Sequence, residues 1–151
     1  MNTPEEILEL ARTRYKESKV LFESELYDGA FYLLGYSIEL ILKHKICLLL
    51  ELPDLFSIET DHSDKPNSSG FRKVLRTHNL TLLLLMSGLW EKFKIAKGDN
   101  RELMNQSSLL IEKWNESCRY HTKGYCNPLD LQHLFNLMNS ENSLYQWILR
   151  N

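Results

Sequence analysis

The sequence predicts an all-α fold: an up-down bundle of four to five helices forming one domain over residues 1–151. Apolar residues recur at helical spacing along most of the chain, and no segment alternates with the period of two that a strand needs. Residues typical of helix N-termini precede several of these segments. A chain of 151 residues is long enough to bury one sizeable hydrophobic core.

The first predicted helix follows the sequence TPEE and runs to about Glu25. Thr3 is the expected N-cap, and Glu6 three residues later completes a capping box. Pro4 then occupies the first helical position, where its missing N–H costs nothing. The sequence YDG at 27–29 predicts a turn after this helix, because an Asp-Gly pair favours positive φ.

The second predicted helix runs from about Ala30 to Glu51 and lies antiparallel to the first, because the connection is short. Its apolar residues cover more than one face, which is typical of a central helix in a bundle. One acid, Glu39, stands among them, and an unpaired buried carboxylate would be costly. Lys43 follows four residues later, so the sequence predicts a helical ion pair on a partly exposed stripe.

The helical pattern is interrupted after the second helix. Residues 53–70 have no period, and they are predicted to form one long, irregular loop. Residues 54–69 of this loop are expected to be mobile. Helical character returns at 71–77. A third helix is then predicted from Leu80 through Phe93 to the sequence KGDN.

Two more helices complete the predicted bundle. Asp99 opens the fourth, whose apolar face extends to Cys118. Residues 119–128, RYHTKGYCNP, form a connector. Asn127 caps the fifth helix, whose apolar face extends to Leu149.

Composition limits the function classes. A formal net charge of −2 gives the whole chain no general attraction to nucleic acid, so any polyanion site has to be a local patch. The N-terminus lacks the pattern of a signal peptide and the apolar stretches are too short to span a bilayer, so a cytoplasmic protein without a membrane partner is expected. The odd count of cysteines and the lack of a Cys-x-x-Cys pair predict free, partly buried thiols at Cys47, Cys118 and Cys126.

The histidines and cysteines do not form a metal-binding pattern. Cys118, His121 and Cys126 are close in sequence, but no fourth zinc ligand accompanies them. No metal and no cofactor are therefore expected. A second group of polar residues is more informative: the connector concentrates hydrogen-bond donors, cations and aromatic rings at Arg119, Tyr120, His121, Lys123 and Tyr125. This segment is either a binding surface or a plain helix end whose tyrosines fold onto the core.

Short segments of the chain resemble landmarks of the HEPN family. The helix DGAFYLLGYSIELILKHKI resembles the family's signature helix, in which an aromatic and small-residue run precedes a glutamate and then a lysine. THNLTLLL, which contains His78, resembles the family's His-Asp-Leu start of the next helix, with Asn79 replacing the aspartate. CRYH resembles the Arg-Tyr segment before its last helix, and LDLQHLFNLMNSENSLYQWILR resembles that last helix.

The resemblance implies a HEPN-like helical bundle that dimerises and works around nucleotides or RNA. Some members of the family are metal-independent ribonucleases of toxin–antitoxin or phage-defence systems, and others are non-catalytic partners of nucleotidyltransferases. The ribonucleases carry a histidine roughly four to six residues after an arginine. After Arg119 these positions hold Gly124, Tyr125 and Cys126. Arg72 and His78 have the right spacing, but they lie at the wrong landmark.

The prediction is therefore a non-catalytic HEPN-like homodimer that binds a nucleotide, RNA or a nucleotidyltransferase-type partner chain. One alternative is a metal-independent ribonuclease toxin that uses Arg119 and His121. Another is a purely structural dimerisation domain. In the HEPN-like reading, Glu39 pairs either with Lys43 or with Arg119 from the connector. The candidate binding residues are Glu39, Lys43, His78, Arg119, Tyr120, His121 and Lys123.

Overall fold

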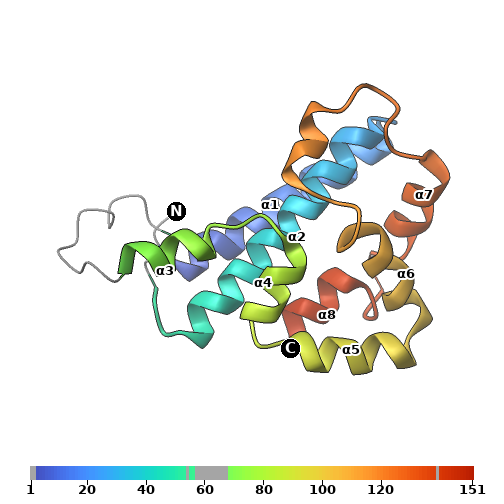
Figure 1. Cartoon of the computed structure of the whole chain (residues 1–151). Coiled ribbons are helices and arrows are strands. Elements are labelled where there is room, and N and C mark those ends of the chain that lie inside the picture. The colour runs from blue at the N-terminus through green and yellow to red at the C-terminus, as the bar shows by residue number, and fades with distance from the viewer. Residues whose placement is uncertain (1–2, 54, 57–67, 139) are drawn as a thin grey trace.

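The computed structural model describes residues 3–53, 55–56, 68–138 and 140–151. That part of the chain contains eight α-helices, one short 3₁₀ helix and no strand (Figure 1). The all-α prediction is confirmed, but the expected four to five helices are divided into shorter ones. The elements are α1 (Pro4–Glu23), α2 (Tyr27–Leu49), α3 (Ser68–Leu75), α4 (Leu80–Met86), α5 (Trp90–Asp99), α6 (Arg101–Leu110), η2 (Glu116–Tyr120), α7 (Pro128–Asn136) and α8 (Leu144–Arg150).

The start of α1 is the capping box that the sequence predicts. The backbone N–H of Glu6 donates to Oγ1 of Thr3 over 3.2 Å, and the backbone N–H of Thr3 donates to the Glu6 carboxylate over 3.4 Å. Both bonds satisfy donors that the first turn of a helix leaves unpaired. Pro4 occupies the first helical position, as expected.

The predicted turn at Asp28 and Gly29 is wrong. Helix α2 already begins at Tyr27. The chain reverses before this helix, at Glu25, which takes a positive φ of 60°. Asp28 thus lies in the first turn of a helix, where a carboxylate favours the positive end of the helix dipole. The Asp-Gly pair therefore belongs to the helix, and the Asp28 side chain has distant backbone partners, described below.

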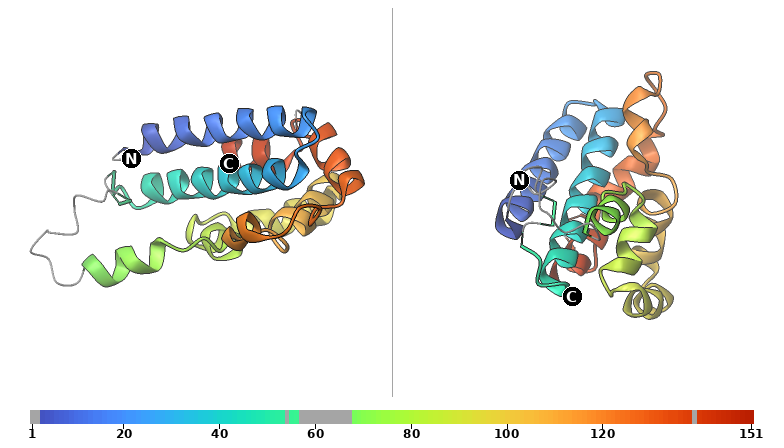
Figure 2. Two further views of the ribbon diagram at one scale, coloured as in Figure 1. Left: turned by 90° about the horizontal axis from the view of Figure 1, so that it is seen from above. Right: turned by 60° about the vertical axis from the view of Figure 1, so that its left-hand side comes forward.

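Helix α2 is the centre of the molecule. It runs antiparallel beside α1, and α4, η2, α7 and α8 also contact it (Figures 1 and 2). Most of its side chains from Ala30 to Cys47 are therefore buried, polar ones included. The prediction of a central helix antiparallel to the first is confirmed.

Gly35 determines how the segment after α6 packs on α2. A Cβ atom at Gly35 would lie 2.2 Å from Cδ1 of the Trp114 indole, which is closer than carbon atoms can approach. The indole Nε1 donates a hydrogen bond to the backbone carbonyl of Tyr32 over 3.0 Å. Because η2 follows Trp114 closely in the chain, this contact also places η2 against α2.

The third predicted helix is two helices. It breaks at Gly88, whose φ of 75° ends α4 before α5 begins at Trp90. The fourth predicted helix begins one residue later than expected, because Asn100 rather than Asp99 is the N-cap of α6. The Asn100 side chain accepts a hydrogen bond from the backbone N–H of Leu103.

The fifth predicted helix is also two helices. Asn127 caps α7 as predicted, but α7 ends at Asn136, and Ser143 caps a separate helix α8. The predicted loop at 53–70 is partly wrong, since Ser68–Leu75 is the helix α3, which lies at the edge of the molecule (Figure 2). The prediction that residues 54–69 are mobile falls mostly on 54 and 57–67, which lie outside the described residues.

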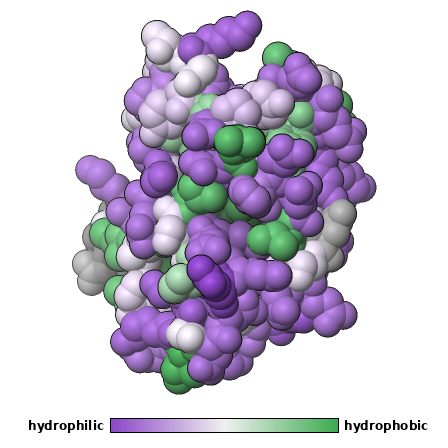
Figure 3. All heavy atoms as spheres, turned by 90° about the vertical axis from the view of Figure 1, so that its right-hand side faces the viewer, coloured by the Kyte–Doolittle hydropathy of each residue, from purple (hydrophilic) through white to green (hydrophobic). Residues whose placement is uncertain are grey.

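The surface is mixed in character. Figure 3 shows the side of the molecule that lies on the right in Figure 1. On this side, separate hydrophobic residues lie among mostly hydrophilic ones. Along the described residues, no helix combines the length and the apolar character that crossing a membrane requires.

Candidate functional site

A buried ion pair occupies the middle of α2. The side chain of Glu39 is 1% exposed, and its Oε1 lies 2.6 Å from Nζ of Lys43. The pairing with Lys43 is the one the sequence predicts, but the partly exposed stripe is wrong, because both residues are buried. The neighbouring helices cover this part of α2. Lys43 also lies over the Phe56 ring, with Nζ 5.4 Å from the ring centroid.

His78 is the second partner of Glu39. Its Nδ1 lies 3.1 Å from Oε1 and 3.0 Å from Oε2 of the carboxylate. The next residue, Asn79, is the N-cap of α4 and accepts a hydrogen bond from the backbone N–H of Leu82. With Nδ1–H donating to Glu39, a neutral imidazole keeps Nε2 as a hydrogen-bond acceptor. The His78 side chain remains 46% exposed, so the ring joins the buried pair to the surface.

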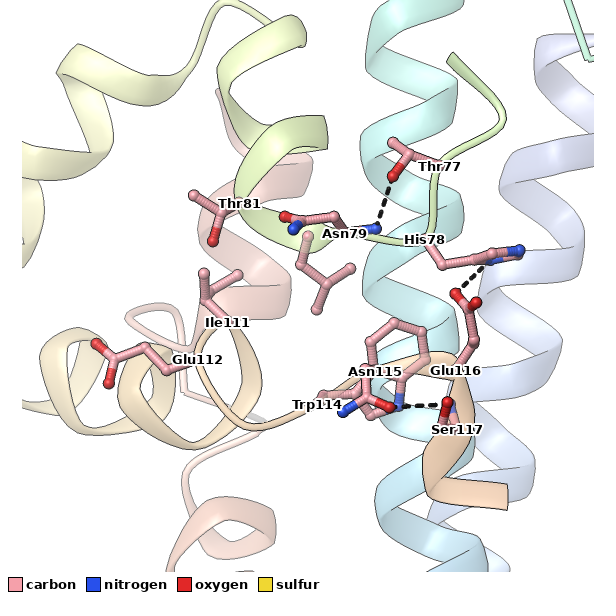
Figure 4. Close-up of a pocket in the computed structure, with 11 residues that line it drawn as sticks. Thr77, His78, Asn79, Thr81, Ile111, Glu112, Trp114, Asn115, Glu116 and Ser117 are labelled. Carbon is pink, nitrogen blue, oxygen red and sulfur yellow. Dashed lines mark hydrogen bonds and ion pairs between the residues drawn. The ribbon is translucent and has the colours of Figure 1, made fainter. Parts of the chain in front are cut away.

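Two cavities meet at His78. The smaller has a volume of about 270 Å³ and is lined by the buried pair and by Ile7, Tyr36, Leu40, Phe56, Arg76 and His78. The larger, of about 790 Å³, lies between the start of α4 and the segment from α6 to η2. Its wall carries the carboxylates Glu112 and Glu116 beside hydroxyl and amide side chains (Figure 4). In that view His78 and Glu116 face each other, with Nδ1 and Oε2 4.0 Å apart.

The connector places aromatic rings and a cation on the surface. The Arg119 guanidinium lies over the Tyr120 ring, 4.8 Å from its centroid, and Tyr120 is 76% exposed. A side-chain hydrogen bond to Tyr32 on α2, with further effects of Tyr120, raises the pKa of Arg119. The His121 ring stacks on Tyr125 with centroids 4.0 Å apart. The alternative in which Tyr120 and Tyr125 fold onto the core is wrong, because both are exposed.

Asp28 fastens this connector to α2, and the sequence interpretation missed it. Its carboxylate accepts the backbone N–H of Gly124 over 2.7 Å and that of Cys126 over 2.8 Å. Burial opposes the charge of Asp28, but these backbone donors outweigh it, and the pKa of Asp28 is lowered. Burial and the neighbouring Asp28 raise the pKa of the Cys126 thiol to about 12. No local pattern indicates such a contact between distant parts of the chain.

The structure gathers the predicted site residues into two groups. Glu39, Lys43 and His78 form the group described above, in which Glu39 and Lys43 are buried and His78 reaches the surface. The exposed group is the connector, in which Lys123 lines a cavity of about 420 Å³ next to Asp28. Of the two alternatives for Glu39, the pairing with Arg119 is wrong: the partners of Glu39 are Lys43 and His78, and Arg119 is exposed with its guanidinium over Tyr120.

The cysteines are free thiols, as predicted: Cys47 and Cys118 are buried and Cys126 is partly buried. Among the described residues, no group of three or more histidine, cysteine, aspartate or glutamate side chains is placed to hold a metal ion.

Comparison of the chain with protein-family models, with curated protein sequences and with solved structures found no significant match.

Proposed function

We propose that the chain is a HEPN-like, non-catalytic helical module that binds RNA or nucleotides and acts as a homodimer. The observation that carries the binding role is the exposed ring of Tyr120 with the Arg119 guanidinium over it, beside the stacked pair of His121 and Tyr125. Single-stranded RNA is bound by stacking of its bases on aromatic side chains and by cations near its phosphates. The connector offers both on one segment.

The meeting of the three landmarks on α2 supports the HEPN-like part of the proposal. His78, from the second landmark, hydrogen-bonds to Glu39 of the signature helix. The 3₁₀ helix η2, which carries Arg119 of the third landmark, contacts the same helix. Two landmarks that lie far from the signature helix in the sequence therefore contact that helix in the fold.

Binding is favoured over cleavage by Arg119 and His121. Metal-free cleavage of RNA needs a proton-transfer group and a cation acting on the same phosphate. Arg119 lies over the Tyr120 ring, whereas His121 stacks on Tyr125, so the two side chains have different partners. A binding role needs only their exposed faces and the charge of Arg119.

The homodimer is supported by apolar side chains at one end of α2. Leu48 and Leu49 are exposed there, and Leu82 and Leu85 are exposed on α4, which contacts α2. Burial of such residues by a second copy would remove apolar surface from water. Sedimentation velocity at micromolar protein checks this, and a monomer there would exclude the homodimer. A nucleotidyltransferase-type partner chain stays a prediction.

The binding role is tested by fluorescence anisotropy with a short labelled oligouridine that ends in a 5′-hydroxyl. Arg119→Ala and Tyr120→Ala are each expected to weaken binding about tenfold, since stacking on one ring is worth about 1–3 kcal/mol. Arg101→Ala is the matched control, because Arg101 is also an exposed arginine but lies on α6.

Two results would contradict the proposal. One is an oligouridine affinity that all three variants leave unchanged. The other is cleavage of the oligouridine that disappears in His121→Ala, which would instead establish the ribonuclease alternative.

A further inference from the structure

We propose that the cavity between α6 and α7 binds a free α-amino acid whose side chain ends in a carbonyl oxygen, as the side chain of glutamine does. Lys113 holds its carboxylate, Asp130 holds its ammonium group, and Gln106 donates to its side-chain oxygen. These three residues line one cavity of about 410 Å³, a volume within the range of small-molecule sites. The inference goes beyond the proposed function and does not depend on RNA binding at the connector.

The packing of the helices leaves this cavity between α6 and α7. Helix α6 packs on α5 and α8, whereas α7 packs on α2, so within the described part of the chain α6 and α7 have little direct contact. Both helices lie on the right-hand side of Figure 1, which is the side that Figure 3 shows. Leu109 from α6 and Leu134 from α7 line the cavity and offer apolar surface to the methylene groups of a ligand.

The observation that points to a ligand is a buried donor on Gln106. The side chain is 2% exposed, and its Oε1 accepts the backbone N–H of Leu144, the first residue of α8, over 2.9 Å. That bond identifies the other end of the amide, Nε2, as the donor. Nε2 is buried and has no hydrogen-bond partner in the described part of the chain. A buried donor without a partner is costly, so a ligand that brings an acceptor oxygen to Gln106 gains affinity.

Gln106 is placed to meet such an oxygen. The residue lines the cavity, and the last torsion of a glutamine side chain is soft, so its amide can tilt toward an oxygen that enters there. A carbonyl oxygen is an acceptor with two lone pairs and matches a single N–H donor.

Two opposite charges line the same cavity and are not paired with each other. Lys113 and Asp130 are exposed, and no ion pair joins either of them to a residue in the described part of the chain. Both also line the neighbouring cavity of about 270 Å³, which places them at the end that the two cavities share. A zwitterion with its carboxylate at Lys113 and its ammonium group at Asp130 forms two charge-assisted contacts at once.

The three contacts together select the class of ligand. A simple carboxylate leaves Asp130 without a partner, and a simple amine leaves Lys113 without one. An amino acid with an apolar side chain pairs with both charges but offers nothing to Nε2 of Gln106. An amino acid whose side chain ends in a carbonyl group provides for all three.

Calorimetric titration of the full chain with L-glutamine, L-norleucine and butanamide tests the inference. L-glutamine is expected to bind. L-norleucine, which lacks the side-chain oxygen, and butanamide, which lacks the charged groups, are each expected to bind at least about tenfold more weakly. In ¹H–¹⁵N spectra, L-glutamine should shift the side-chain amide signals of Gln106, because Nε2 gains a hydrogen bond, and L-norleucine should not.

Two variants test the charged contacts. Lys113→Ala and Asp130→Asn change exposed side chains, so the fold should be kept, and each should weaken the binding of L-glutamine about tenfold. Lys92→Ala and Asp99→Asn are the matched controls, because these residues are also exposed but lie on α5. Both controls should leave the affinity unchanged.

The inference and the proposed function fail separately. If the oligouridine binds at the connector but L-glutamine does not bind, the amino-acid site is overturned and the proposed function stands. Equal affinities for L-glutamine and L-norleucine, or an affinity that Lys113→Ala and Asp130→Asn leave unchanged, also overturn it. L-glutamine should not displace the oligouridine, and displacement would overturn the assignment of the amino acid to the cavity between α6 and α7.

Discussion

The ammonium of Lys43 lies 2.6 Å from the carboxylate of Glu39, and the pair is almost completely removed from water. A charge that loses its partner in such a place is strongly destabilising, even where the pair itself adds little stability. The structure of the central helix therefore depends on both residues being present together.

Removal of Lys43 should destabilise the protein strongly. Lys43→Met leaves Glu39 with His78 alone, and we expect the free energy of unfolding to fall by about 3–5 kcal/mol in urea titrations. Glu39→Gln combined with Lys43→Met removes both charges and should recover a large part of this loss. A loss below about 1 kcal/mol in Lys43→Met would show that water reaches the pair.

Glu39 and Arg119 should be energetically independent. A double-mutant cycle of Glu39→Gln and Arg119→Ala is expected to give a coupling energy within about 0.5 kcal/mol of zero, because they have different partners. The same cycle with His78→Ala in place of Arg119→Ala should give a coupling clearly above that limit, since His78 contacts the carboxylate directly. The reverse ranking would contradict the described contacts.

Gly35 should not tolerate a methyl group. In Gly35→Ala the new Cβ would overlap the Trp114 indole, and overpacking of this kind costs about 1–3 kcal/mol or more. Gly98→Ala is the matched control, because nothing lies within 4 Å of a Cβ there and the residue is inside α5. We expect Gly98→Ala to be neutral or to stabilise by up to about 1 kcal/mol, measured by thermal and urea unfolding. Equal effects of the two changes would refute the close contact.

Protonation of Asp28 at acid pH should lower the stability of the protein. Its pKa is lower in the folded chain than in the unfolded chain, so its stabilisation is complete above the unfolded value and is lost as the pH falls through the folded value. Asp28→Asn keeps one acceptor for the two backbone donors, and should cost about 1 kcal/mol at pH 7, a value reduced by the partial exposure of the side chain.

The test of Asp28 is the difference in unfolding free energy between wild type and Asp28→Asn, followed from neutral to acid pH. This difference should shrink as the pH falls, because the wild-type carboxylate becomes protonated. A difference that is constant with pH would mean that the charge of Asp28 does not contribute.

Local interactions were predictable from the sequence. The capping box of Thr3 and Glu6 and the cap at Asn127 involve residues within three positions of one another. The pairing of Glu39 with Lys43 spans one helical turn and is equally local. Periodicity alone also identified the all-α class and the central helix, because both follow from how apolar residues repeat along the chain.

The breaks in the later helices were harder to see. The apolar period continues across Gly88 and across Ser143, although α4 and α7 each stop before these residues. Two short helices that bury their faces in one core keep a shared period, so periodicity does not reveal where one ends. The positive φ of Gly88 and the cap at Ser143 are local signals, but they are decisive only once the core bends the chain there.

Only the tertiary structure decided what Glu39 does. Its burial comes from helices that pack on α2 from other parts of the chain, and its bond to His78 joins residues 39 positions apart. The same holds for Asp28 and the backbone N–H of Gly124, which are 96 positions apart. No periodic pattern and no fixed spacing in the sequence indicates such contacts, because they depend on how whole helices pack against one another. The sequence alone determined the helices and their caps, and packing determined which polar residues meet.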